Sequence, residues 1–250
     1  MKKTCALVIF SGLIVANTVQ GSDISGTVTL KGTPPPELEI KQIKEDINCG
    51  KLHTEPVKTR FYVAGANGAL ADVFVTLKGI SGKSTGATAS PAMIDQKGCE
   101  YTPYVLGVQT GQKILVKNSD PVLHNIHPVP AASGNKEENR AQVPGQPDLT
   151  FVFPSPEIFL KFKCDVHPWM FAYACVVDHP FFAITDKDGK YTIKGVPDGK
   201  YTMEVYHRKA APANSPMTAE VEVKGGNVAK DFTRYGLTVT TLANPGKPVL

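Results

Sequence analysis

The sequence predicts an all-β protein, and three features of its 250 residues support this fold class. Short runs rich in β-branched and aromatic residues recur along the chain, with turn-forming residues between them. Glycine and proline are abundant, at 22 and 20 copies, as is typical of β-sandwiches and barrels. Almost no stretch has the apolar period of a helix. The expected strands span residues 24–30, 71–77, 104–108, 113–116, 149–153, 159–162, 171–177, 191–193, 201–206 and 219–223.

The rest of the chain is expected to form turns and loops. One helical turn is predicted within residues 37–48. The proline-rich segment 33–36 and the polar segment 131–148 are predicted to be ordinary exposed loops.

Residues 1–21 have the layout of a cleavable secretory signal. Lys2 and Lys3 precede an apolar run from Cys5 to Ala16, which is shorter than the ~20 residues that a membrane span needs. A retained anchor is the alternative. No later apolar stretch is long enough to span a membrane, so we expect a mature chain from about Ser22 with no integral membrane segment, in the periplasm or secreted.

The charge balance argues against a nucleic acid as a partner. Loss of Lys2 and Lys3 with the signal lowers the formal net charge from +4 to +2, and the chain has no block of like charges. Binding to phosphates needs a concentrated basic face.

Four cysteines lie beyond the expected signal: Cys49, Cys99, Cys164 and Cys175. In an oxidising compartment paired cysteines normally form disulfides. We favour a disulfide between Cys49 and Cys99, which would attach the N-terminal segment to the central part of the chain. A pairing of Cys99 with Cys175 stays open, although Cys175 lies in an apolar strand and is expected to be a buried free thiol.

Two hairpins near the C-terminus indicate a small β-sandwich. Asp188-Gly189 and Asp198-Gly199 supply turn residues between alternating strands. This pattern resembles the second half of a carboxypeptidase-regulatory-like (transthyretin-type) module. The strands at 26–28 and 71–77 resemble its first half, so the resemblance implies a module divided between residues 22–92 and 180–250.

The pattern richest in chemistry joins His124-Asn125-Ile126-His127 to a motif forty residues later, Cys164-Asp165-Val166-His167-Pro168-Trp169-Met170. Type 1 (blue) copper is bound by two imidazole nitrogens and one thiolate in a near-trigonal plane, with a weak axial thioether. His124, Cys164, His167 and Met170 supply this set. One loop would deliver three ligands, and a remote strand end would deliver the fourth.

Residues 93–179 resemble a cupredoxin, and the Cys164 loop resembles that of amicyanin, Cys-x-x-His-Pro-aromatic-Met. The resemblance implies a Greek-key β-sandwich nested in the divided module; one enlarged cupredoxin is the rival arrangement. It also implies that His124 is the ligand, with His127 as the alternative, and that Asn125 pins the two ligand loops and donates toward the sulfur. Pro168 and Trp169 would flank an exposed edge of His167.

Other interpretations of the motif fit less well. Structural zinc needs four strong ligands, and methionine is a poor one. Cys164 as a plain buried thiol, with the histidines as core residues, does not account for the combined spacing.

The predicted function is therefore that of an exported carrier of single electrons with one type 1 copper ion. Its partners would be transient redox proteins, such as a cytochrome or a periplasmic oxidoreductase. Copper sequestration or delivery is the alternative, and a structural role with incidental copper is a third. An enzyme is disfavoured, because six histidines leave no second paired set for a catalytic copper.

Overall fold

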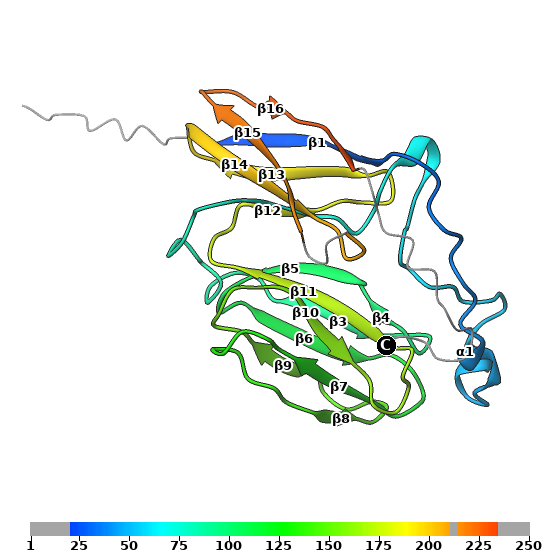
Figure 1. Ribbon diagram of the computed structural model, residues 1–250. Helices are drawn as coiled ribbons and strands as arrows, with labels where there is room; N and C mark the ends of the chain where they lie inside the picture. Colours follow the sequence, from blue (N-terminus) through cyan, green and yellow to red (C-terminus); the bar gives the residue numbers. More distant parts are fainter. Residues whose placement is uncertain (1–20, 211–214, 235–250) are drawn as a thin grey trace, which may run out of the picture.

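The computed structural model describes residues 21–210 and 215–234, and nearly all of its regular structure is β-strand. Four sheets are stacked in two pairs, which we call the upper and lower sandwiches after their places in Figure 1. The predicted all-β class is thereby confirmed. The expected signal, residues 1–21, lies almost entirely outside the described residues. In the part of the chain that is described, no helix is long and apolar enough to cross a membrane.

The upper sandwich is built from both flanks of the chain. In one sheet β1 lies between β13 and β16 and also pairs in parallel with β17; the other has the order β12-β2-β14-β15. Its strands are β1 (Ser22–Leu30), β2 (Phe74–Leu77), β12 (Phe182–Ile184), β13 (Lys190–Val196), β14 (Gly199–Tyr206), β15 (Met217–Val223), β16 (Val228–Ala229) and β17 (Phe232–Arg234).

Alternation along the strands creates the upper core. On β13, for example, Tyr191, Ile193 and Val196 are buried, while Lys190, Thr192 and Lys194 are exposed. Successive side chains of a strand point to opposite faces, so one apolar face of each sheet meets the other.

The lower sandwich uses the chain between β2 and β12. Its sheets have the orders β5-β11-β10-β7-β8 and β4-β3-β6-β9. The strands are β3 (Ala92–Gln96), β4 (Tyr101–Thr102), β5 (Val105–Gln109), β6 (Lys113–Asn118), β7 (His124–Val129), β8 (Arg140–Gln142), β9 (Leu149–Val152), β10 (Glu157–Lys163) and β11 (Phe171–Val177).

An aromatic layer joins the two sandwiches. Phe74 of β2 is fully buried between Phe182, at 5.7 Å between ring centroids, and Tyr206, at 6.4 Å. Gly107 of β5 lies directly beneath Phe182, where an added Cβ would come within 2.6 Å of the ring. The missing side chain therefore lets β5 approach the upper sandwich.

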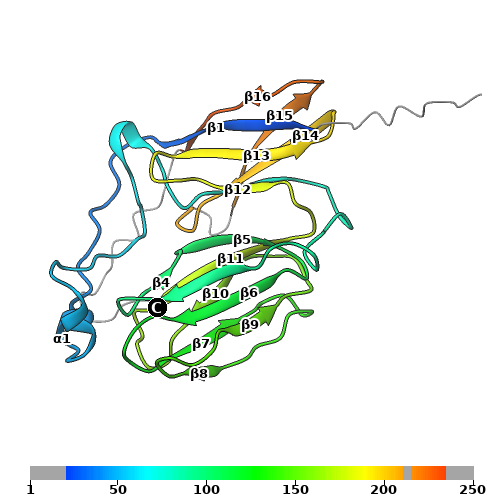
Figure 2. The same ribbon diagram turned by 180° about the vertical axis from the view of Figure 1, so that it is seen from behind.

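One local expectation needs correction. The polar segment 131–148 is more than a loop, because β8 within it pairs with β7. The helical turn expected within residues 37–48 is present as α1 (Lys41–Glu45). Two short 3-10 helices come after it, η1 (Cys49–Leu52) and η2 (Ala66–Gly68). Both Figure 1 and Figure 2 place α1 beside the lower sandwich, at the end where β4 lies.

We predict that His207 makes the stability of the fold depend on pH. Its ring is buried and stacks on Tyr62. Burial, with Arg234, Lys209 and Arg208 nearby, lowers its pKa to about 4. Between this value and the ordinary pKa of ~6.5 the unfolded chain binds the proton more tightly, so stability falls as the pH falls through this window.

Urea unfolding measured from pH 7.5 to pH 5 is the check. Relative to His207→Gln, the parent should lose roughly 2 kcal/mol over that interval. Parallel stability curves for the two proteins would show that His207 has no such role.

Candidate metal centre

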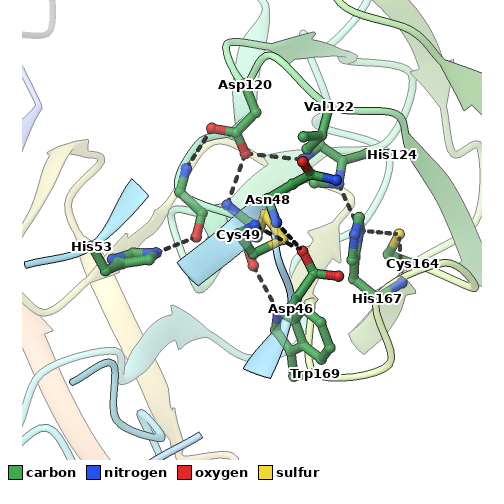
Figure 3. The surroundings of a disulfide bond; sticks show 12 residues. Asp46, Asn48, Cys49, His53, Asp120, Val122, His124, Cys164, His167 and Trp169 are labelled. Carbon is green, nitrogen blue, oxygen red and sulfur yellow. Dashed lines mark hydrogen bonds and ion pairs between the residues drawn. A yellow bond between two sulfur atoms is a disulfide. The ribbon is translucent and has the colours of Figure 1, made fainter. Parts of the chain in front are cut away.

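Three of the predicted ligands converge in the structure. The Nδ1 atoms of His124 and His167 are 2.9 Å apart, and Cys164 Sγ lies 3.7 Å from His167 Nδ1. One donor atom from each of the three residues lies within 4.8 Å of the others, and all three residues are buried. Figure 3 shows the His167 ring linked by dashed lines to the His124 ring on one side and to the Cys164 sulfur on the other.

The lower sandwich delivers these groups from two places. His124 is the first residue of β7, and Cys164 directly follows β10. The loop from Cys164 to β11 is closed by two backbone hydrogen bonds, from Cys164 N to Met170 O at 3.1 Å and from Met170 N to His167 O at 2.9 Å. Met170 is fully buried in the same core as Cys164. A tight turn thus holds three of the four predicted ligands together.

Asn125 connects the two ligand-bearing segments. Its side-chain oxygen accepts hydrogen bonds from Asp165 N at 2.7 Å and from the Cys164 thiol at 3.2 Å. Its backbone N–H, rather than its side-chain amide, donates to the sulfur. The side-chain NH2 group instead donates to Asn139, in the segment before β8. Asn125 therefore pins the loops with its carbonyl, and its amide faces away from Cys164.

Asp120 is a functional candidate that the sequence reasoning missed. Its buried carboxylate accepts hydrogen bonds from His124 Nε2 at 2.9 Å, Gly98 N at 2.6 Å and Cys99 N at 2.7 Å. The bond to Nε2 fixes the ring so that Nδ1 points at the cluster, as carboxylates beside metal-binding histidines do. No spacing rule links Asp120 to His124 in the sequence.

The surroundings change the acidity of the cluster. Burial alone raises the pKa of the Cys164 thiol, but hydrogen bonds from His124, His167 and the backbone N–H groups of Asn125 and His167 outweigh it and lower the pKa to about 6. For Asp120, burial raises the carboxyl pKa, but the hydrogen bonds from His124, Cys99 and Gly98 lower it overall. The site thus favours a thiolate, the form of cysteine that binds metals.

The expected exposed edge of His167 is absent from the structure. His167 is only 6% exposed, because the segment around α1 and η1 lies against it. Cys49 and Cys99 are joined in a disulfide, and both sulfurs lie within 4.8 Å of a His167 ring nitrogen. Trp169 is half-buried, with its ring 5.2 Å from that of His167 and Nε1 donating to Cys99 O at 3.1 Å. Of the two residues expected to flank an exposed edge of His167, Pro168 is exposed.

The remaining histidines lie away from the cluster or face other groups. His127 is bound on both ring nitrogens by carboxylates, Asp165 and Glu137, each at 2.7 Å. His53 bonds to Gly98 O, while His179 is buried and accepts a hydrogen bond from Phe181 N. Cys175 is a buried free thiol on β11.

The donor set fits copper better than zinc. Nitrogen and sulfur ligands bound at about 2.0–2.3 Å to one ion lie about 3–4 Å from each other, and the distances of 2.9 Å and 3.7 Å fall at or near this range. Two imidazoles, one thiolate and a buried thioether match the preferences of type 1 copper, whereas zinc sites lack methionine.

Comparisons with known proteins give partial matches. No known family and no curated protein matches the sequence. Among solved structures, a mutant of amicyanin in the Cu(I) form aligns with 41% of this chain and 97% of its own, at 19% identity and a TM-score of 0.31. A purple cupredoxin from Nitrosopumilus maritimus covers 34% of this chain and 98% of its own, at 24% identity and a TM-score of 0.29.

A third match is to a much longer chain. The copper-containing nitrite reductase of Thermus scotoductus SA-01 aligns with 35% of this chain, at 18% identity and a TM-score of 0.31. The alignment spans 22% of the length of that reductase.

We predict that Cys164 titrates well below an ordinary thiol in the metal-free protein. Ultraviolet absorbance of the thiolate, taken as the difference from Cys164→Ser, should rise with a midpoint near pH 6. Cys175 does not interfere, because burial raises the pKa of its thiol to about 12. A midpoint above pH 8 would contradict the hydrogen-bonded geometry of the cluster.

Proposed function

We propose that this protein binds one type 1 copper ion and carries single electrons in the cell envelope. The observation that supports this most strongly is the buried convergence of His124 Nδ1, His167 Nδ1 and Cys164 Sγ, with Met170 on the same loop. Copper held there would supply one-electron exchange between its cupric and cuprous states.

The protein's own contribution is a rigid and dry ligand set. Asp120 fixes the His124 ring, and Asn125 ties the Cys164 loop to β7. His124 and Cys164 are almost completely shielded from water. Ligands held in this way keep one arrangement in both oxidation states, so little reorganisation accompanies electron transfer.

The proposed domain arrangement rests on the sequence resemblances to a cupredoxin and to a carboxypeptidase-regulatory-like module. We propose that residues 93–179 form a cupredoxin nested in a carboxypeptidase-regulatory-like module made of residues 22–92 and 180–250. The order of strands supports this arrangement. β2 precedes strands β3 to β11 in the sequence, and it pairs with β12 and β14, which follow them. Export to the periplasm is supported by the signal-like residues 1–21 and the Cys49–Cys99 disulfide.

A transient redox protein is the proposed partner. Leu123 and Val166 directly precede the proposed ligands His124 and His167, and these two residues are 43% and 50% exposed. Exposed apolar residues beside a redox site suit weak and short-lived docking. A catalytic role is disfavoured, because His53, His179 and His207 lie apart, each with its own contacts.

Copper sequestration or delivery remains the second candidate, and the covered edge of His167 favours it. A carrier would exchange electrons rapidly with a small soluble redox reagent, whereas a storage protein would not. Stopped-flow reduction of the copper-loaded protein separates the two functions.

The visible spectrum of the chain loaded with Cu(II) tests the proposal. An intense sulfur-to-copper charge-transfer band should appear, vanish with ascorbate and be absent from Cys164→Ser. Cys175→Ser is the matched control and should keep the band, because this thiol lies outside the cluster. A colourless loaded protein would exclude the electron-carrier function.

We also predict that Asp120→Asn weakens metal binding by about 10–100-fold, because the His124 ring loses its carboxylate partner. Competition with a chromophoric chelator measures the affinity. Asp198→Asn is the control: it removes a carboxylate that bonds to Gly225 N in a remote turn. Equal affinities for Asp120→Asn and the parent would show that Asp120 does not position the ligand.

A further inference from the structure

A short excursion of the chain lies over the metal cluster. We call residues 40–57 the cap: it carries α1 and η1, and its two ends are joined by a hydrogen bond from Ile40 N to Val57 O at 2.9 Å. Figure 3 shows its Asp46 and Cys49 beside His167 and Trp169. The cap is what buries the ligand edge that the sequence predicted to be exposed.

Apart from the disulfide, the cap has few attachments. Within residues 21–210 and 215–234, one hydrogen bond links it to the rest of the protein, from the His53 ring to Gly98 O at 2.7 Å. Ile43 is its one buried aliphatic side chain, Ile40 and Val57 at its two ends are partly buried, and Ile47 is 74% exposed. A cavity of about 150 Å³ is lined by the cap and the adjoining Glu39. The bond between Cys49 and Cys99 is therefore the main anchor.

The sulfurs of this anchor lie among metal-binding atoms. Those of Cys49 and Cys99 are within 4.8 Å of a His167 ring nitrogen, and the Cys99 sulfur is also within 4.8 Å of donor atoms of Asp120 and His124. All of these residues are buried. A disulfide binds metals poorly, but two thiolates and an imidazole form a set that suits soft Cu(I).

The thiol form necessarily exists, since a disulfide forms from two thiols after the chain is made. We propose that Cys49 and Cys99, as thiols, form with His167 a transient Cu(I) loading site, which disulfide formation then abolishes as it fastens the cap. This inference rests on the proposed copper function for its second stage, in which His167 stays bound while Cys164 and His124 replace the two cap thiolates.

Oxidation of the two thiols to the disulfide requires an oxidant, and a disulfide reagent can serve as one. Cys49 and Cys99 lose two protons and two electrons as their S–S bond forms. A disulfide oxidant takes them up and becomes a dithiol. Before that step the weakly attached cap can move aside, which gives an ion access to His167.

The test uses full-length Cys164→Ser, which lacks the thiolate of the main site. Its disulfide form and its dithiol form, prepared with a phosphine reductant, compete for Cu(I) supplied as the bicinchoninate complex. The dithiol form should bind one Cu(I) on the order of 100-fold more tightly, because thiolate bonds are gained. Circular dichroism verifies that both forms are folded.

Matched variants identify the ligands. Cys49→Ser or Cys99→Ser, each added to Cys164→Ser under reducing conditions, should lower affinity to that of the disulfide form. Cys175→Ser added in the same way should leave it unchanged, and Cys5 is common to all variants. Equal binding by the two redox forms, or tight binding without Cys49, would overturn the loading site. Because Cys164 is absent, these outcomes are independent of whether the parent shows a charge-transfer band.

Discussion

The Asp120 carboxylate is the contact on which the arrangement of the site depends. It joins His124, the only proposed ligand outside the Cys164 loop, to Gly98 and Cys99 in the turn that holds the cap. A buried carboxylate is stable only when its oxygens accept hydrogen bonds, and here three donors meet that need. The same three bonds therefore satisfy the charge, set the direction of an imidazole and place a disulfide next to it. The Asp120 carboxylate therefore holds both the His124–Cys164–His167 cluster and the turn to which the cap is attached.

Much of the fold and of the site was predictable from local sequence. β11 has the predicted bounds of residues 171–177, because its apolar run is continuous and ends in turn residues. Strands β3, β4, β8, β12, β16 and β17 were missed, and β7 was expected only as a strand end at His124. Short or polar strands carry little periodic signal and form through their partners. The proposed ligand residues could be selected from the sequence because the loop fixes their spacing. Asp120, Asp46 and the covering of His167 depend on segments far apart in sequence, which spacing does not report.

The cap separates this chain from a simple small sandwich. Its disulfide and Ile43 both enter the core that contains Cys164 and Met170, and Ile40 and Val57 pack against the edge of that core. The aromatic layer along the β5–β11 side of the lower sandwich attaches the upper sandwich through Phe74 and Phe182. The lower sandwich is thus covered by the cap at the end that holds the His124–Cys164–His167 cluster, and along one sheet by the upper sandwich. Both coverings come from sequence outside its own strands.

The pairing of β1 has a consequence for the order of folding. This first strand pairs with β13, β16 and β17, whose residues lie more than 160 positions later, so its sheet cannot close until nearly the whole described chain is available. Strands β3 to β11 pair among themselves over a much shorter interval. As the chain emerges from its N-terminus, the lower sandwich can therefore assemble while β1 is still unpaired. A strand left unpaired for that time is exposed to aggregation, and its serines, threonines and glycine make it less adhesive than an unbroken apolar run.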